Sequence, residues 1–469
     1  MTTDVTERID VLLALADLEP PLAYVPGPDT PPGASTAIVL DAYFAAQPEA
    51  YVRELDAWRA RNPPAADARC FAFVVSYNEL DHLAAMVALY AAQPGADELA
   101  VVFVVNYTQR DDAEKTRADE RTFRASTELL LALQRQHPFV HVVAKRFSSR
   151  VGGLARARKY AMDYALRTCG GTADPDAGVL VANEGDTLAF SDGYLSAYRS
   201  RIGTGRERFV QGRVAYPDEI RAAPLLQLYA DVRERVHIGQ GLRDDRHPGF
   251  EGVMPIGRNY AVHPKVAGLA GGIDPVALPS AEDDLTFGFD IYHRLGNAAK
   301  EYADDIVVTT HPRREILIVQ GLLSGRPDDA QSMYENFHGA SEIYDISGAE
   351  YRRAIDDIAT YGDTPAHRCL VVNHFYQWVV RTVIKNAFLD DPAWRAVSED
   401  NRRHRIGYWE REARQDAIYE RALAALPPVE RDRFLTGLVD ESLAWFNELV
   451  AGVACFGAAT VALDSRLEA

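Results

Sequence analysis

Short runs rich in β-branched residues alternate with amphipathic stretches through the middle of this 469-residue chain. The apolar runs, which we expect to be strands, are residues 71–76, 99–106, 140–144, 179–183 and 209–214. Between them, apolar residues recur three and four positions apart, which predicts helices near 79–93, 112–136 and 153–167. Strands that alternate with helices form a mostly parallel sheet wrapped by helices. The sequence therefore predicts an α/β fold.

Segments of different character lie on both sides of this region. Residues 1–66 contain two helix-like pieces separated by a proline-rich stretch, which predicts an appended N-terminal helical extension. After about residue 325 the strand pattern fades and helical periodicity continues. We expect three parts: the extension at 1–66, an α/β domain at 67–324, and an all-helical domain at 325–469 that could serve for self-association.

Composition narrows the class of protein. The chain is 47% hydrophobic and carries a formal net charge of −18. Sequence-independent nucleic-acid binding needs a basic face, so nucleic acid is excluded as a partner. The four cysteines are far apart, which argues against a zinc site or a disulfide framework and favours a cytoplasmic protein. The N-terminus lacks a secretory pattern, and the longest apolar run, at 449–463, predicts a buried C-terminal helix rather than a membrane span.

Two carboxylates follow one of the expected strands. Val179–Asn183 leads into Glu184-Gly185-Asp186, and carboxylates at positions i and i+2 of an extended end point the same way, so both could bind one hard divalent cation. The alternative is a polar turn in which Gly185 supplies a positive φ and both acids face water.

The Glu-Gly-Asp motif is one of several motifs that occur along the chain. In chain order they are Tyr77-Asn78-Glu79, Asn106, Glu184-Gly185-Asp186, Gly271-Gly272-Ile273-Asp274, Glu282-Asp283-Asp284 and His311. Over roughly residues 70–315 this order resembles the GT-A fold glycosyltransferases, and within them family 2. The resemblance implies a Rossmann-like catalytic domain that takes a sugar from a nucleotide-diphosphate donor, such as a UDP-, GDP- or dTDP-sugar, and passes it to a small-molecule or glycan acceptor.

The resemblance implies a set of nucleotide contacts. Ser76, Asn78 and Glu79 would meet the base and ribose, together with Asn106 and Glu184. For Asn78 the alternative is a helix N-cap ahead of a helix that begins with Glu79.

A diphosphate would be bound near the start of the helix at 153–167. Arg150, Arg156 and Arg158 lie there, where free amides and guanidinium groups attract anions, and Arg156 ranks first. The alternative is that these arginines face solvent on an amphipathic helix.

The resemblance also implies a metal site. Asp186 would be the principal ligand, with Glu184 and His311 as further ligands, and such a mixed shell suits Mn²⁺ or Mg²⁺. A divalent ion would neutralise the charge that develops on the departing nucleotide. For His311 the alternative is a surface histidine before Pro312.

Asp283 would be the general base of an inverting transfer, with Asp284 second. One carboxylate must take the proton from the acceptor hydroxyl as it attacks the anomeric carbon. The alternative is that these acids simply occupy the first turn of a helix, where the macrodipole favours negative charge.

The sequence departs from the family at several points. Glu184 and Asn106 stand where the family usually has Asp, and no Gln-x-x-Arg-Trp motif follows, which favours transfer of a single sugar over polymerisation. Two alternatives stay open: a retaining transferase of the glucosyl- or mannosyl-glycerate type, and a non-catalytic nucleotide-sugar-binding scaffold.

Overall fold

The computed structural model describes residues 24–243, 257–275, 282–324, 348–397 and 408–451. Within these ranges 32, 66, 110–112, 149–152, 297–298, 389–390 and 395 are not described, and residues 15–16 and 22 are described in addition. Two compact units divide the chain. One consists of Met1–Ala215 and Val253–His311, and the other of Tyr216–Gly252 and Pro312–Ala469.

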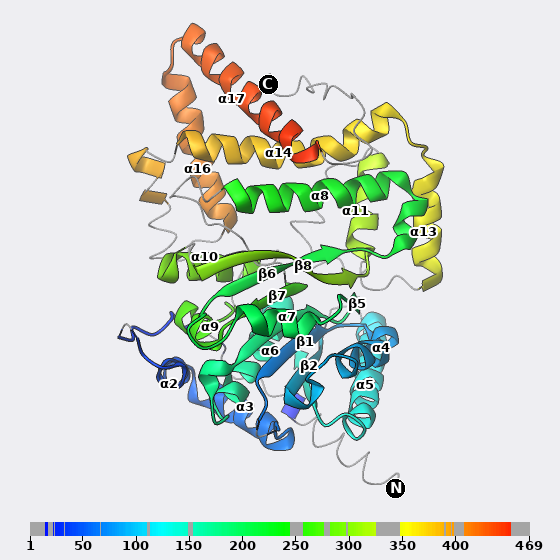
Figure 1. Ribbon diagram of the computed structural model, residues 1–469. Coiled ribbons are helices and arrows are strands. Elements are labelled where there is room, and N and C mark those ends of the chain that lie inside the picture. Colours follow the sequence, from blue (N-terminus) through cyan, green and yellow to red (C-terminus); the bar gives the residue numbers. More distant parts are fainter. Residues whose placement is uncertain are drawn as a thin grey trace. The chain divides into compact units, whose positions relative to one another are not determined.

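An eight-stranded mixed sheet forms the centre of the first unit (Figure 1), with the strand order β3-β2-β1-β4-β7-β6-β8-β5. The strands are β1 Cys70–Ser76, β2 Leu99–Thr108, β3 Val140–Phe147, β4 Val179–Glu184, β5 Thr187–Phe190, β6 Phe209–Ala215, β7 Asn259–Val262 and β8 Lys300–Thr310. Only β5 and β7 run opposite to the other strands. The mostly parallel α/β class predicted from the sequence is therefore confirmed.

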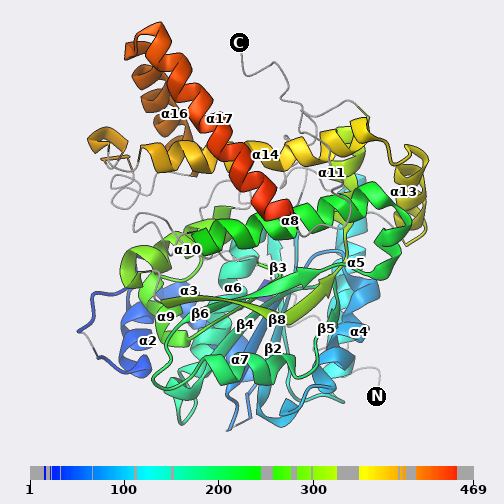
Figure 2. The same ribbon diagram turned by 45° about the horizontal axis from the view of Figure 1, so that its top comes forward.

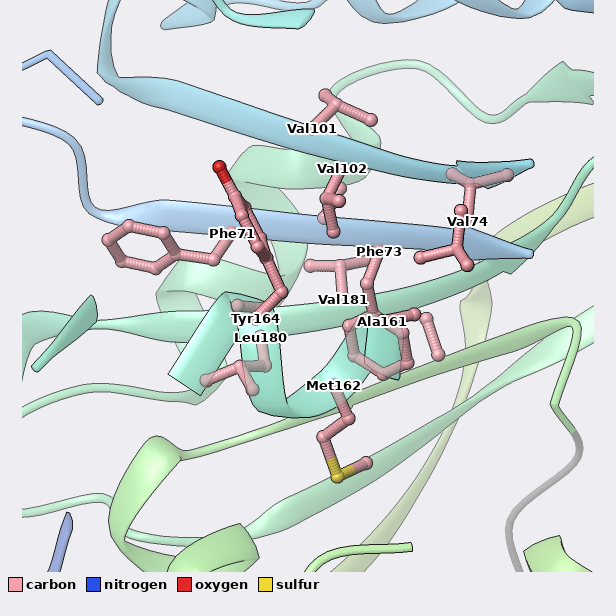
Figure 3. Packing of buried hydrophobic residues seen from close by; sticks show 14 of the residues in the cluster. Phe71, Phe73, Val74, Val101, Val102, Ala161, Met162, Tyr164, Leu180 and Val181 are labelled. Carbon is pink, nitrogen blue, oxygen red and sulfur yellow. The ribbon is translucent and has the colours of Figure 1, made fainter. Parts of the chain in front are cut away.

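Helices cover the sheet because its central strands are apolar on both faces. Every residue of β1 is buried, and α6 (Leu154–Cys169) packs on β1, β2 and β4. The other helices of this unit are α2 Thr36–Ala45, α3 Glu49–Arg61, α4 Leu80–Ala91, α5 Ala113–Gln134, α7 Tyr194–Arg201, α9 Pro264–Ala270 and α10 Glu282–Leu295. Figure 3 shows Phe71 and Phe73 of β1 close to Tyr164 and Ala161 of α6.

The N-terminal helices belong to the same unit as the sheet. The side chains of Tyr43, Tyr51 and Trp58 are fully buried and join the core of the sheet. Helix α3 packs on α6, and α2 packs on α9. Residues 36–61 are therefore built into the α/β unit.

The second unit is helical in the residues that the structure describes. Its helices are α8 Pro224–Arg243, α11 Arg313–Leu323, α13 Gly348–Thr360, α14 Pro365–Ala387, α16 Tyr408–Ala425 and α17 Pro428–Val450. Helices α14 and α17 pack against α8 (Figure 2), around a core that includes Leu226, Val319, Val379 and Phe446. The helical C-terminal region is thus confirmed.

The division differs in detail from the sequence expectation. The sequence suggested one boundary near residue 325, whereas α8 and α11 group with the C-terminal helices because they bury their apolar faces in that second core. Among the described helices, none is long and apolar enough to span a bilayer. Most of the apolar run at 449–463 lies outside the described residues.

Candidate functional site

The carboxyl ends of neighbouring strands bring the predicted residues to one edge of the sheet. Strand β1 lies between β2 and β4, so Ser76 ends next to Val105 and Val75 pairs with Glu184. Ligands of open α/β sheets bind beyond this edge. The ends of β1 and β4 are thus adjacent in space, although more than a hundred residues separate them in the sequence.

Asp186 and His311 lie next to each other at the paired ends of two antiparallel strands. Thr187 of β5 pairs with Thr310 of β8, and the His311 N–H donates to the Asp186 carbonyl at 3.1 Å. Both residues are buried, and the Thr310 hydroxyl donates to Asp186 Oδ1 at 2.9 Å. The two residues predicted as metal ligands are therefore neighbours in the structure, joined through their backbones.

Gly185 is required for space rather than for its backbone conformation. It does not belong to the residues with positive φ, so the turn alternative considered from the sequence is wrong on this point. A Cβ at this position would lie 2.8 Å from Glu79 Cγ and 3.2 Å from the Val75 carbonyl oxygen. Glu79, from the predicted Tyr-Asn-Glu turn, is therefore packed directly against the Glu-Gly-Asp motif.

Glu184 has partners different from those of Asp186. Its Oε1 forms an ion pair with Nη2 of Arg158 on α6, and its Oε2 accepts from Nε of Arg258 at 3.1 Å. Both arginines are buried. Each Glu184 oxygen is thus already bound by a guanidinium group.

Arg158 also binds a second predicted carboxylate. Its Nη1 lies 2.9 Å from Asp284 Oδ2, and the same oxygen accepts from the Gly257 N–H at 2.9 Å. A Cβ on Gly257 would lie 2.3 Å from Arg158 Nη2, so only glycine lets the backbone approach the guanidinium this closely. Because a guanidinium carries five donors in a fixed fork, it can hold Glu184 and Asp284 at once.

The two candidate bases differ in what the structure shows of them. Asp283 lies in the first turn of α10, as predicted, but its side chain lies outside the described residues. Asp284 is buried and already accepts two hydrogen bonds on Oδ2. A carboxylate occupied in this way suits a positioning role better than proton abstraction.

The end of β1 offers one polar atom without an internal partner. Ser76 Oγ is buried and makes no hydrogen bond with the described residues. Asn106 is also buried and donates from Nδ2 to the Ser76 carbonyl at 3.1 Å. A buried hydroxyl of this kind costs free energy unless a partner satisfies it.

The Tyr-Asn-Glu turn differs from the N-cap alternative. Helix α4 begins at Leu80 with Glu79 at the N-cap position, so Asn78 does not cap it. Asn78 instead has a left-handed φ of 55° and donates to Asp119 Oδ1 at 3.2 Å.

Of the three arginines around the start of α6, the structure places Arg158 among the site's carboxylates. Arg156 is half-buried on the same helix, and Arg150 lies outside the described residues. Gly153, just before α6, lies near Thr108 at the end of β2, because a Cβ there would be 3.8 Å from the Thr108 hydroxyl.

Sequence reasoning missed two residues of this region. Arg258 precedes β7, whose four residues gave no recognisable strand pattern, so the arginine was not identified as a partner of Glu184. His82, in the first turn of α4, has its ring centroid 5.7 Å from that of His311. No sequence pattern linked His82 to His311.

The residue before Glu184 is held in place by hydrogen bonds of its own. This residue, Asn183, accepts from the Tyr90 hydroxyl at 2.6 Å and donates to the Arg258 carbonyl at 3.1 Å. Burial raises the pKa of Tyr90 well above its usual value, so this hydroxyl stays protonated and remains a donor.

The residues present fit Mn²⁺ or Mg²⁺ with two protein ligands. Among the described residues, no group of three or more His, Cys, Asp and Glu side chains is placed to hold a metal ion. The predicted set of three ligands includes Glu184, but both of its oxygens bind arginines. Asp186 and His311 remain as the two candidate ligands. Mg²⁺-type sites commonly use one or two protein ligands and complete their shell with substrate phosphates and water.

Comparison with known proteins gives similarity to solved structures alone. No family model matches the chain, and no curated protein does. A mannosyltransferase from Pyrobaculum calidifontis, solved with GDP-Man and Mn²⁺, is 15% identical over 89% of this chain and 97% of its own, with a TM-score of 0.34.

Glucosyl-3-phosphoglycerate synthase from Mycobacterium tuberculosis is similar as well. One of its structures, solved with Mn²⁺, UDP-Glc and phosphoglyceric acid, is 12% identical over 65% of this chain and 87% of its own, with a TM-score of 0.29. Another is 13% identical over 60% and 84%, with a TM-score of 0.30. Similarity at this level does not identify a reaction, so function has to be argued from the residues of the site.

Proposed function

We propose that this protein is a metal-dependent glycosyltransferase, similar to family 2 of the GT-A enzymes, that moves a single sugar from a nucleotide-diphosphate donor to a hydroxyl acceptor. The observation that carries the proposal is the Asp186 and His311 pair at the carboxyl edge of the sheet. A carboxylate and an imidazole that are both buried at this end of the sheet would supply two ligands for a divalent ion.

The nucleotide would bind at the ends of β1 and β2. Ser76 Oγ supplies a buried hydroxyl there, with Asn106 and Glu79 beside it. The start of α6 and Arg156 would receive the diphosphate, because helix N-termini favour anions. Held by Asp186 and His311, Mn²⁺ or Mg²⁺ would neutralise the negative charge that develops on the departing diphosphate.

Transfer would proceed by inversion. The acceptor oxygen forms a bond to the anomeric carbon while the bond from that carbon to the donor's phosphate oxygen breaks, and the nucleoside diphosphate leaves with the electron pair. Asp283 takes the acceptor's proton, since Asp284 is held by Arg158 and Gly257. Arg158 and Arg258 together offset the charges of Glu184 and Asp284, which lets two carboxylates occupy one buried region.

A donor screen tests the function. The full chain is incubated with UDP-glucose, GDP-mannose and dTDP-glucose, with and without Mn²⁺, and release of the nucleoside diphosphate is measured. We expect one base to be preferred and its donor to be cleaved in a metal-dependent way. The matching nucleotide at 100 times its Kd should stabilise the fold by about 2.7 kcal/mol.

Each other result has a definite meaning. Metal-dependent nucleotide binding without cleavage of any donor, in the presence of an acceptor mixture, would point to a scaffold. A first product with the donor's anomeric configuration by NMR, together with an active Asp283→Asn variant, would point to a retaining enzyme. Absence of both binding and cleavage would refute the proposal.

A further inference from the structure

The turn between β1 and α4 has an unusual backbone. Among the described residues, Asn78 is the one non-glycine residue with a positive φ, at 55°. Asparagine tolerates this region better than most residues, but an isolated left-handed residue still persists only where its surroundings hold it in place. The turn lies between Ser76, at the end of β1, and Glu79, at the start of α4.

Asp119 of α5 supplies the support. Its side chain is almost fully buried, and its two oxygens accept hydrogen bonds from consecutive residues of the turn. Oδ2 accepts from the Tyr77 hydroxyl at 2.9 Å, and Oδ1 accepts from Asn78 Nδ2 at 3.2 Å. Since the two bonds come from adjacent residues, they fix both the position and the rotation of the turn.

This arrangement changes what the turn can offer to a ligand. The Asn78 amide nitrogen donates to Asp119, so the side chain predicted to contact a nucleotide is held by an internal bond. The turn's backbone and the buried hydroxyl of Ser76 lie next to it. Their position depends on the conformation of Tyr77 and Asn78.

We propose that Asp119 is a positioning residue of the nucleotide site, which holds the Tyr77–Asn78 turn in its left-handed conformation so that Ser76 and Glu79 meet the nucleotide. The inference deepens the proposed function and rests on it. Nothing in the sequence marked Asp119, which lies on a helix rich in charged residues.

The test compares nucleotide affinity between variants of the full chain. Asp119→Asn keeps the shape of the side chain but removes the charge and leaves a single acceptor oxygen, which cannot accept from Tyr77 and Asn78 together. With Mn²⁺ present, we expect the Kd for whichever of UDP, GDP and dTDP binds the wild type to rise about tenfold, as for loss of one charge-assisted bond. Glu120→Gln, on the same helix, should leave the Kd unchanged.

A second pair of variants separates positioning from plain stability. Asp119→Ala should raise the Kd at least as much as Asp119→Asn does. Adding Asn78→Gly to Asp119→Ala should recover part of the loss, because glycine adopts a left-handed φ without support. A purely structural role would lower the melting temperature of the Asp119 variants and leave the Kd where it was.

The outcomes of this experiment separate the two proposals. A wild-type chain that binds UDP, GDP or dTDP while both Asp119 variants bind it equally well would overturn the inference and leave the proposed function standing. A wild-type chain that binds none of these three nucleotides would remove the proposed function and this inference together. Should Asp119→Ala fail to fold, the isosteric Asp119→Asn variant decides the question.

Discussion

Arg158 is the residue on which the charge balance of the site depends. Its guanidinium joins Glu184 of β4 to Asp284 of α10, and Gly257 leaves it the room to do so. A lysine ammonium is a point charge that cannot hold both carboxylates in a fixed plane.

We therefore expect Arg158→Lys to lower kcat/KM for donor cleavage by about 10²-fold while the chain stays folded. Steady-state kinetics with the preferred donor provide the measurement. Arg167→Lys on the same helix is the control, since Arg167 binds Asp56 at 2.9 Å and takes no part in the site. Equal activity of the two variants would show that Arg158 is not needed for the reaction.

Buried His141 predicts a pH dependence of stability. Burial lowers the pKa of His141 to about 4 from an ordinary 6.5, and its Nδ1 lies 2.9 Å from the Tyr164 hydroxyl. Between these two pH values the unfolded chain binds a proton that the folded chain does not. The free energy of unfolding should therefore fall by about 1.4 kcal/mol per pH unit as the pH drops from 6.5 to 4.

Urea unfolding at several pH values, for the wild type and for His141→Gln, measures this effect. The slope of the unfolding free energy against pH should be smaller in the variant by about 1.4 kcal/mol per pH unit, which corresponds to one bound proton. Burial also lowers the pKa of His374 to about 4 and that of His263, so the variant should keep a residual slope. Identical slopes for the two proteins would contradict the assignment.

At the scale of elements, helix α6 joins the N-terminal helices to the site. Lys159, one residue after Arg158, pairs with Asp163 at 2.8 Å, and both are fully buried. Asp163 also accepts hydrogen bonds from Tyr43 of α2 at 2.7 Å and from Tyr51 of α3 at 3.0 Å. A Cβ on Gly272 of the Gly-Gly-Ile-Asp motif would lie 2.5 Å from the Tyr43 hydroxyl oxygen, so this motif also packs against the N-terminal helices.

Lys159→Met should destabilise the protein by about 3–5 kcal/mol, because it leaves Asp163 buried without a counter-charge. Lys265→Met, which removes a partly exposed pair with Glu207 at 3.4 Å, should cost less than about 1 kcal/mol. Chemical unfolding monitored by circular dichroism distinguishes the two variants. Similar losses in both would mean that the buried network contributes little to the fold.

The elements recognised from the sequence were those whose physical pattern is local. The strands β1 to β4 and β6 appear as apolar runs because parallel strands covered on both faces are apolar throughout. The short strands β5 and β7 were not recognised, since four residues carry too little periodicity to stand out. Their antiparallel pairing is nonetheless what brings Asp186 opposite His311 and places Arg258 beside Glu184.

At the scale of the whole molecule, the sequence predicted which residues lie at the site more completely than it predicted the contacts that each of them makes. As motif order indicated, the predicted site residues lie at strand ends or in the loops and helices beside them. They are Ser76, Asn106, Glu184, Asp186, Asp284 and His311. The partners of Glu184 and Asn78 could not be foreseen, because Arg158, Arg258 and Asp119 reach them through tertiary packing from distant segments. The division into two units depends likewise on long-range burial, which placed α8 and α11 in the second core.

The most direct test of the proposed function is Mn²⁺-dependent release of nucleoside diphosphate from the preferred donor by the wild type, Asp186→Asn and His311→Ala. Both variants should fold and lose about 10²-fold or more of the metal-stimulated rate, since each removes a proposed ligand. Asp192→Asn, an exposed acid beyond β5, should keep the wild-type rate. Metal-dependent rates at the wild-type level in both Asp186→Asn and His311→Ala would contradict the assignment of the site.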